Sequence, residues 1–504
     1  MQFRLRVVPH RRSLPLSVDA GVAGSVAMKV VVIGAGVGGL CAAIRLQSAG
    51  HDVTILERNP MVGGKLSALS EQGYTFDLGP TLFTMPHLFD EVFRLTGSSL
   101  AAQVEMTRLD PQFHYRWPDG SSLDVPNERE RLLDRVESLA PDDGDAWMDF
   151  EYHAQQIWEV AERTFLAGTV DSPWSLVKRS KNPLDLDRVE GKRTLNRLAR
   201  AYFDDPRLHQ LVGRYATYSG SSPYQAPGTL SCIFHIEQEY GCWHLHGGIS
   251  VLAERLATTA RRIGVDIRLG VDVGRVTTAR GSVSGVDLAD GGSEPADIVV
   301  SDVDAEHLYT DLLPDSRRRK RITKLGRSMS AFVMCAAVRG HSEGIAHHNV
   351  FFSLDDEQEF ADLAKGRLAT DPTIYACVSS VTDSSMAPRD GENWVFLVNV
   401  PAEMGIDRKL MSAAVLNRVA ERGIDLRERI DFTRTLLPAD IDARYRAPGG
   451  AIYGTSSNGR TAAFRRPANV GPVDGLFLVG GSTHPGGGLP LVATGARIVA
   501  DLVG

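Results

Sequence analysis

Three glycines in the spacing of a dinucleotide-binding loop give the first indication of chemistry. Gly34, Gly36 and Gly39 form a GxGxxG pattern directly after a run of β-branched residues. In such a loop the first glycine permits a tight turn, the second lets the backbone approach a pyrophosphate, and the third allows close helix–strand packing. The free N–H groups and the positive dipole end of the following helix attract the phosphates. The spacing therefore predicts a site for FAD or NAD.

An acidic residue follows this loop at the position that a dinucleotide site requires. Glu57 ends a second apolar run, about twenty residues after the last of these glycines. There its carboxylate can accept hydrogen bonds from ribose hydroxyls, and its charge disfavours a 2′-phosphate. The sequence therefore argues against NADP but leaves FAD and NAD open.

The elements that would position these residues are local and follow in the expected order. The sequence predicts a buried strand over 29–33, a helix over 40–46 that ends before Gly50, and a second strand over 53–56. A tight turn without a ligand would need neither the second strand nor its terminal acid. Shortly afterwards, Gly63 and Gly64 would bring bare backbone to the same pyrophosphate, and Lys65 would add a positive charge.

A second glycine-rich segment lies near the other end of the chain. A buried strand is predicted over 476–479, and the loop of residues 480–488 that follows it is made mostly of small residues, among them Gly480, Gly481 and Gly488. Such a loop can pass close to a flat ring. The helix predicted from Leu489 would direct its N-terminus at that ring, where negative charge develops when a flavin is reduced.

Several motifs together resemble the bacterial-type phytoene desaturases, a family of FAD-dependent carotenoid desaturases. In chain order they are E-R-x₄-G-G-K at 57–65, F-x-D-P at 203–206, S-P-Y-x-A-P at 222–227, G-x-W-x₃-G-G at 241–248, F-x-R-P-x-N at 464–469 and G-x-x-T-H-P-G-x-G-L-P at 480–490. Lysine replaces the more usual arginine at position 65. Its side chain therefore offers a single point charge where arginine would offer a fork of hydrogen-bond donors. The resemblance covers most of 28–504 and is weakest over 105–200 and 340–440, while the segment 214–224 is similar to the hydroxycarotenoid 3,4-desaturase branch.

The resemblance implies an α/β fold in which a Rossmann-like FAD-binding domain of the glutathione-reductase/amine-oxidase type is interleaved with an α+β substrate domain. We expect the FAD-binding domain to comprise 28–105, 230–305 and 440–504. The substrate and membrane-contact domain would comprise 106–229 and 306–439.

The resemblance also assigns expected roles to residues outside the glycine loops. The backbone at Val273 would meet the adenine of FAD. Four aromatic residues would contact substrate, namely Tyr215, Tyr218, Tyr224 and Trp243, although without the resemblance they are equally typical of core or pocket aromatics. His484 could act near the substrate as a base, but we favour a structural role that orients its loop.

The implied reaction is desaturation of an acyclic C40 or C30 carotenoid. Hydride would pass from an allylic carbon to FAD, the adjacent carbon would lose a proton, and oxygen or a quinone would reoxidise the flavin. No catalytic dyad is evident. Alternatives on the same fold are a carotenoid isomerase and a terminal oxidase. A binding protein without flavin is disfavoured, because it would not need the intact glycine loops.

The net charge and the hydropathy of the chain limit which partners and which cellular location we expect. The net charge of −7 gives no reason to expect nucleic-acid binding, and no apolar run is long enough to span a membrane. Between Trp174 and Arg200, however, eight basic residues stand against three acidic ones. Such a segment can bind an anionic membrane surface, from which an insoluble carotenoid would have to be extracted. A second basic run at 317–321 is more typical of an ordinary surface helix.

The remaining expectations concern the start of the chain and its thiols. Residues 1–27 are interpreted as a disordered leader or as an early start codon, because Met28 directly precedes the first strand. The five scattered cysteines show no metal-binding or disulfide spacing, so we expect reduced thiols and no metal in a cytoplasmic, peripherally membrane-associated protein.

Overall fold

The computed structural model of the protein describes residues 26–170, 173–180, 182 and 185–504. The predicted leader lies outside this range except for its last two residues. The predicted basic segment from Trp174 to Arg200 lies only partly inside it. Among the helices of the described residues, none has both the length and the apolar character that crossing a bilayer requires.

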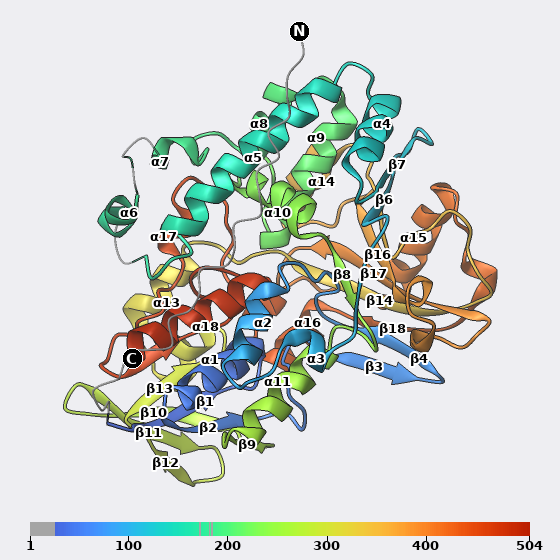
Figure 1. Cartoon of the computed structure of the whole chain (residues 1–504). Coiled ribbons are helices and arrows are strands. Elements are labelled where there is room, and N and C mark those ends of the chain that lie inside the picture. Colours follow the sequence, from blue (N-terminus) through green and yellow to red (C-terminus); the bar gives the residue numbers. More distant parts are fainter. Residues whose placement is uncertain (1–25, 171–172, 181, 183–184) are drawn as a thin grey trace.

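A five-stranded sheet forms the base of the molecule (Figure 1). Its strands, all parallel, are in spatial order β19 (Leu476–Leu478), β13 (Ile298–Ser301), β1 (Lys29–Ile33), β2 (Asp52–Glu57) and β9 (Asp266–Leu269). Successive side chains of a strand point to opposite faces, and here both faces are covered. Val30 and Val32 pack with the helices α1 (Val37–Ser48), α11 (Val251–Arg262) and α18 (Leu489–Val503).

The opposite face of this sheet is covered by a small antiparallel sheet and the segment after β13. Val31 and Ile33 share a core with strands β10 (Val273–Ala279) and β11 (Ser282–Leu288) and with Leu308. Strand β12 (Ser293–Pro295) completes the small sheet, and α12 (Ala305–His307), η3 (Leu308–Leu312) and α13 (Ser316–Thr323) follow. Regular pairing of β10 with β11 starts at Val273.

A seven-stranded mixed sheet forms the second half of the molecule. Its spatial order is β18 (Ile430–Leu436), β14 (Ser330–Arg339), β17 (Gly391–Val400), β16 (Ile374–Val378), β15 (His348–Phe351), β6 (Phe113–Arg116) and β7 (Ser122–Val125). Strand β15 pairs in parallel with β6, which comes from a distant part of the chain. Helix α15 (Arg408–Glu421) covers one face, and the hairpin of β3 (Ala68–Glu71) and β4 (Tyr74–Asp77) packs on the other.

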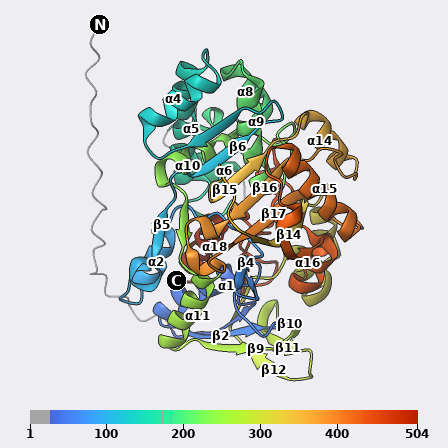
Figure 2. The same cartoon turned by 90° about the vertical axis from the view of Figure 1, so that its right-hand side faces the viewer.

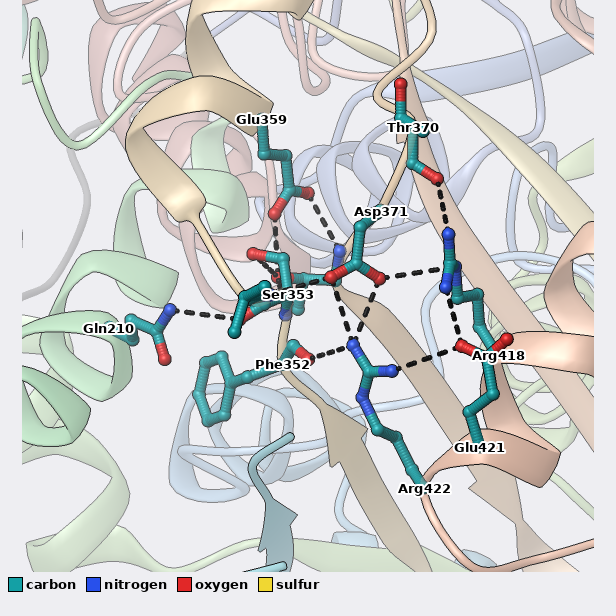
Figure 3. Close-up of polar contacts among 11 residues, drawn as sticks. Gln210, Phe352, Ser353, Glu359, Thr370, Asp371, Arg418, Glu421 and Arg422 are labelled. Carbon is teal, nitrogen blue, oxygen red and sulfur yellow. Dashed lines mark hydrogen bonds and ion pairs between the residues drawn. The ribbon is translucent and has the colours of Figure 1, made fainter. Parts of the chain in front are cut away.

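A cluster of charged residues fastens the end of α15 to the segments that follow β15 and precede β16 (Figure 3). Arg422 donates to both oxygens of Asp371, at 3.0 and 3.1 Å, and to the carbonyl of Phe352. Beside it, Glu359 of α14 (Asp356–Ala364) accepts two hydrogen bonds from Thr373. Burial raises the pKa of Glu359 to about 7. All of these contacts join parts of the fold to one another.

A layer of helices caps the seven-stranded sheet at the end distant from the parallel sheet (Figure 2). Its members are α4 (Arg129–Leu139), α5 (Gly144–Thr164), α8 (Leu195–Tyr202), α9 (Pro206–Gly213), η1 (Arg214–Ser219), η2 (Gly228–Ser231) and α10 (Cys232–Tyr240). Their core contains the buried rings of Trp147, Phe150, Phe203 and Phe234, which meet edge-on or tilted.

Shorter elements connect these layers. They are α2 (His87–Arg94), α3 (Leu100–Gln103), β5 (Met106–Arg108), α6 (Pro173–Arg179), α7 (Asp185–Arg188), β8 (Trp243–Leu245), η4 (Ser379–Val381), η5 (Ser384–Met386), η6 (Arg427–Arg429), α16 (Pro438–Tyr445), η7 (Pro448–Gly450) and α17 (Ala462–Arg465).

Two contacts bear on where the predicted domains would be divided. Helix α10 packs on α5 of the helical layer, although the predicted boundary at 230 places it with the nucleotide-binding part. Leu308 and Ile322 pack on the parallel-sheet side, although the boundary at 305 places them with the substrate part. The predicted division into domains stays a prediction.

Candidate functional site

The loop between β1 and α1 has the backbone geometry of a dinucleotide site. Gly34 has a φ of +100° and donates its N–H to the carbonyl of Leu56 at 2.8 Å. Gly36 is the N-cap of α1 and provides no side chain to cap the first turn. A Cβ on Gly39 would collide with the carbonyl of Gly34. The first turn of α1 therefore has no cap from a side chain at its own N-cap position, and its N–H groups lie at the helix end that attracts anions.

Glu57 ties this loop to the strand beside it. Its carboxylate is only 5% exposed, and Oε2 accepts the N–H of Ala35 at 2.8 Å. Oε1 accepts the backbone N–H of Asn59 at 2.7 Å and its side-chain amide at 2.8 Å. Because each carboxylate oxygen has two lone pairs, acceptor capacity remains for ribose hydroxyls. Val271 donates to the carbonyl of Glu57 at 2.9 Å, which brings the start of β10 and Val273 to the same end of the site.

The predicted glycine pair lies directly on the first loop. Gly63 has a φ of +106° and donates to the carbonyl of Ala35 at 2.8 Å. A Cβ on Gly64 would come within 3.3 Å of the Cα of Gly36. Lys65 donates its ammonium to the carbonyl of Ile452 at 2.8 Å. Burial lowers the pKa of Lys65, while nearby Asp304 and Asp302 act in the opposite direction.

The C-terminal loop passes next to these glycines and is held by backbone contacts. Gly480 has a φ of +93°, and a Cβ on Gly38 would come within 3.0 Å of the N atom of Gly480. Gly481 lies close to Gly487, and Gly488 is the N-cap of α18, which begins at Leu489.

Two residues of the F-x-R-P-x-N motif hold that loop in place. Arg466 donates to the carbonyls of Tyr453, Thr455 and Gly481 at 2.9 to 3.0 Å. Asn469 donates its amide to the carbonyl of His484 at 2.8 Å. Burial lowers the pKa of Arg466 to about 10. Sequence reasoning assigned this motif no physical role, because its partners are main-chain carbonyls that carry no sequence signal.

Sequence reasoning also missed two acidic residues, Asp302 and Asp304, in the loop after β13. A Cβ on Gly36, Gly38 or Gly480 would collide with the carboxylate of Asp302. Asp304 has an Oδ2 atom that is buried and has no hydrogen-bond partner among the described residues. The available signal was their position at the carboxyl end of a parallel strand, where ligands of such sheets bind.

The three glycine-rich segments fit a flavin dinucleotide. They meet at the edge of the parallel sheet where its strands have their carboxyl ends. There the glycine backbone of one segment lies directly against the glycine backbone of the next. The unpartnered Oδ2 of Asp304 adds an acceptor for a hydroxyl group. Glu57 supplies an acceptor, Lys65 supplies a positive charge, and the first turn of α1 supplies backbone N–H groups.

His484 is held by the loop between α5 and α6. Its Nε2 lies 3.1 Å from the carbonyl oxygens of Phe165 and Gly168, so this nitrogen carries the proton and donates it. Burial lowers the pKa of His484 to about 4, and the ring is therefore neutral at physiological pH. Its Nδ1 has no partner among the described residues. These contacts favour the orienting role over that of a base.

The structure brings Tyr215 and Tyr218 together but leaves the other predicted substrate residues apart. Tyr215 and Tyr218 donate to the two oxygens of Glu237, at 2.8 and 2.7 Å, and Arg214 lies 3.3 Å from the same carboxylate. Tyr215 is only 2% exposed, so its hydroxyl serves a closed core network. A substrate contact for either tyrosine stays a prediction.

Tyr224 and Trp243 have separate surroundings. Tyr224 donates to Asp356 at 2.9 Å, and the indole N–H of Trp243 donates to the carbonyl of Tyr240 at 2.8 Å. All five cysteines are free thiols in the structure. Cys377 does lie near His347 and His348, whose Nδ1 atoms contact Thr382 at 2.9 Å and Tyr375 at 2.8 Å. The expected lack of a metal stays a prediction.

The fold and the glycine-rich site together define a flavin-dependent oxidoreductase. The chain matches the model of the flavin containing amine oxidoreductases over residues 37–503 and belongs to that family. This confirms the predicted α/β fold class, the FAD cofactor and the enzyme class.

Among known proteins, the chain is 32% identical to the 4,4'-diapolycopene oxygenase of Methylomonas sp, over 94% of this chain and 98% of the relative. It is also 32% identical to the 1-hydroxycarotenoid 3,4-desaturase of Flavobacterium sp. strain P99-3, over 94% of this chain and 99% of the relative. The predicted resemblance to carotenoid desaturases is thereby confirmed. A crystal structure of an oxidoreductase from Methanosarcina mazei shares the fold, with a TM-score of 0.65 at 17% identity over 94% of this chain and 100% of that chain.

Proposed function

We propose that this protein is an FAD-dependent carotenoid desaturase that introduces carbon–carbon double bonds into an acyclic carotenoid. The observation that carries the proposal is that three glycine-rich segments converge around Glu57 and Asp302. The relatives of the chain also include a hydroxycarotenoid desaturase. The alternative with specific support is an oxygenase on terminal carbons, because a relative of equal identity is a 4,4'-diapolycopene oxygenase.

In the proposed reaction, bound FAD supplies the acceptor for a hydride from the substrate. The residues of the chain position that acceptor and keep water away. Glu57 and the first turn of α1 bind the nucleotide half, and Arg466 and Asn469 fix the loop of residues 480–488 that faces the other half. Neither His484 nor Tyr453 is suited to take up the substrate proton at neutral pH. Burial lowers the pKa of His484 to about 4 and raises the pKa of Tyr453 to about 12. The protein therefore acts mainly through positioning.

The mass of the product distinguishes the candidate reactions. Purified holoenzyme is incubated with hydroxylated and non-hydroxylated acyclic carotenoids in lipid vesicles, with oxygen or a quinone as acceptor. We expect products lighter by two hydrogens per step and with red-shifted absorption. A gain of oxygen would favour the oxygenase, and an unchanged mass with altered retention would favour an isomerase. No change with any acyclic carotenoid would contradict all three.

We infer further that the enzyme takes its substrate from an anionic membrane surface through helix α13. Arg317, Arg319, Lys320 and Arg321 are exposed on this helix, and no ion pair involves them within the described part of the chain. The segment that follows α13 contacts 454–456 through Ser328 and Ser456, close to the carbonyls that Arg466 holds. On α17, Phe464 is 39% exposed, and Figure 1 places α6, α17 and α13 on one side of the molecule.

Neutralising α13 should weaken membrane binding. Since each basic residue near an anionic surface contributes about 1 kcal/mol, replacing Arg317, Arg319, Lys320 and Arg321 by glutamine should reduce partitioning to phosphatidylserine-containing vesicles at least tenfold. Vesicle sedimentation measures this. The control replaces four exposed but ion-paired arginines, Arg268, Arg339, Arg367 and Arg427, by glutamine. Equal losses in both variants would contradict a specific role for α13.

A further inference from the structure

The carboxylate of Asp302 lies at the centre of the flavin site. Asp302 follows β13 directly and accepts backbone hydrogen bonds from Gly36 and Gly39, the N-cap and first turn of α1. Asp302 is partly exposed, although most of its surface is covered by protein. These amides lie at the N-terminal end of α1, the end of a helix beside which a dinucleotide pyrophosphate binds.

The groups that face Asp302 do not supply enough positive charge to neutralise both the carboxylate of Asp302 and the pyrophosphate of FAD. Glu57 faces it from the end of β2, and Lys65 faces it from the segment that follows. The same pocket contains Asp304 from its own loop and Cys41 from α1. Lys65 is shared between Asp302 and Asp304 and already donates to the carbonyl of Ile452. Arg45, also on α1, is paired with Glu91 at 3.5 Å. A doubly charged pyrophosphate would therefore meet a carboxylate that one lysine only partly compensates.

We propose that Asp302 takes up a proton when FAD binds, so that a neutral carboxyl lies beneath the pyrophosphate and FAD affinity falls as pH rises. The proposal rests on the flavin cofactor of the family and not on the identity of the carotenoid. A neutral carboxyl still accepts the N–H groups of Gly36 and Gly39, and it gains a proton that it can donate to an anion.

The charge environment sets the pH range of this effect. Burial, reinforced by Glu57, raises the pKa of Asp302 to about 7, while the backbone N–H of Gly39 and Lys65 act in the opposite direction. Below this pH the free protein already holds the proton, and binding takes up none. Above it, each unit of pH weakens binding by up to tenfold, because one proton must be taken up. FAD should therefore bind about tenfold more weakly at pH 8 than at pH 6.

The decisive variant is Asp302→Asn, which keeps the acceptor oxygen and the size of the side chain but cannot titrate. Holoenzyme is diluted between pH 6 and pH 8, and the fluorescence of released FAD gives its dissociation constant. We expect a change of about tenfold in the natural chain and less than twofold in Asp302→Asn. The control is Asp287→Asn, an exposed carboxylate on β11, which should keep the full pH dependence.

A second measurement covers the case in which Asp302→Asn does not retain its fold. Calorimetric titration of FAD into the flavin-stripped natural chain, at pH 7.5 in buffers of different ionisation enthalpy, gives the number of protons bound. We expect an uptake between one half and one proton per FAD. No uptake, or an unchanged pH dependence in Asp302→Asn, would overturn the proposal. Since neither measurement uses a carotenoid, a failure here is distinct from a failure of the proposed desaturase activity.

Discussion

Replacing Glu57 by alanine should yield a chain that folds but purifies almost without flavin. The variant leaves a buried backbone donor, the N–H of Ala35, and a partly buried one, the N–H of Asn59, without their acceptor. Each unpaired buried donor costs about 1–3 kcal/mol, so the conformation that binds the nucleotide is lost together with the contacts to ribose. We expect FAD affinity to fall by about 100-fold or more, since 1.4 kcal/mol corresponds to a factor of ten.

The ratio of absorbance at 450 nm to that at 280 nm in the purified protein measures the flavin content of Glu57→Ala. The matched control is Asp52→Asn, which removes an exposed carboxylate at the opposite end of the same strand. That variant should retain its full complement of flavin. A flavin content of Glu57→Ala equal to that of the natural chain would show that the nucleotide does not depend on this carboxylate.

Replacing Glu237 by leucine should cause a comparably large loss of stability. Glu237 and Arg214 are both almost fully buried, and Arg214 also lies 4.4 Å from the centre of the Phe113 ring and donates to Tyr115 at 2.7 Å. Removing one partner leaves an uncompensated buried charge, which costs about 3–5 kcal/mol. Urea unfolding of the holoenzyme should show a correspondingly lower midpoint.

Two further variants separate lost charge from lost volume at this pair. Replacing both members, Arg214→Met with Glu237→Leu, should recover much of the stability, because no unpaired charge remains. Asp425→Asn, which breaks the exposed pair with Arg427, should lower the unfolding midpoint far less than Glu237→Leu does. If Glu237→Leu were as stable as Asp425→Asn, the buried ion pair would contribute nothing to the free energy of unfolding.

The local part of the nucleotide site could be predicted because its signals are contiguous. Strand, glycine loop, helix and terminal acid follow one another from Lys29 to Glu57, and the strand lies at the predicted residues. Helix α1 starts at Val37, earlier than predicted, because Val37, Gly38 and Gly39 form its buried first turn. Glycines carry no apolar periodicity, so pattern analysis placed this start too late.

The residues that sequence reasoning missed depend on contacts between distant segments. Asp302 reaches Gly36 only because β13 pairs with β1, with Ser301 opposite Ile33. Glu237 of α10 meets Arg214 of η1 only because these two elements come together within the helical layer. Neither contact between these distant segments can be derived from one sequence. The hydroxyl groups of Tyr215 and Tyr218 also gave no sign of the buried ion pair that they contact.

The position of β19 and α18 has a consequence for the order in which this protein is made. The parallel sheet lacks an edge strand, and α1 lacks one of the helices packed against it, until residues 476–503 have left the ribosome. Strand β6, synthesised early, must likewise wait for β15 to complete its sheet. The nascent chain therefore carries an unfinished flavin pocket until these residues have been made, and cofactor capture follows the synthesis of β19 and α18.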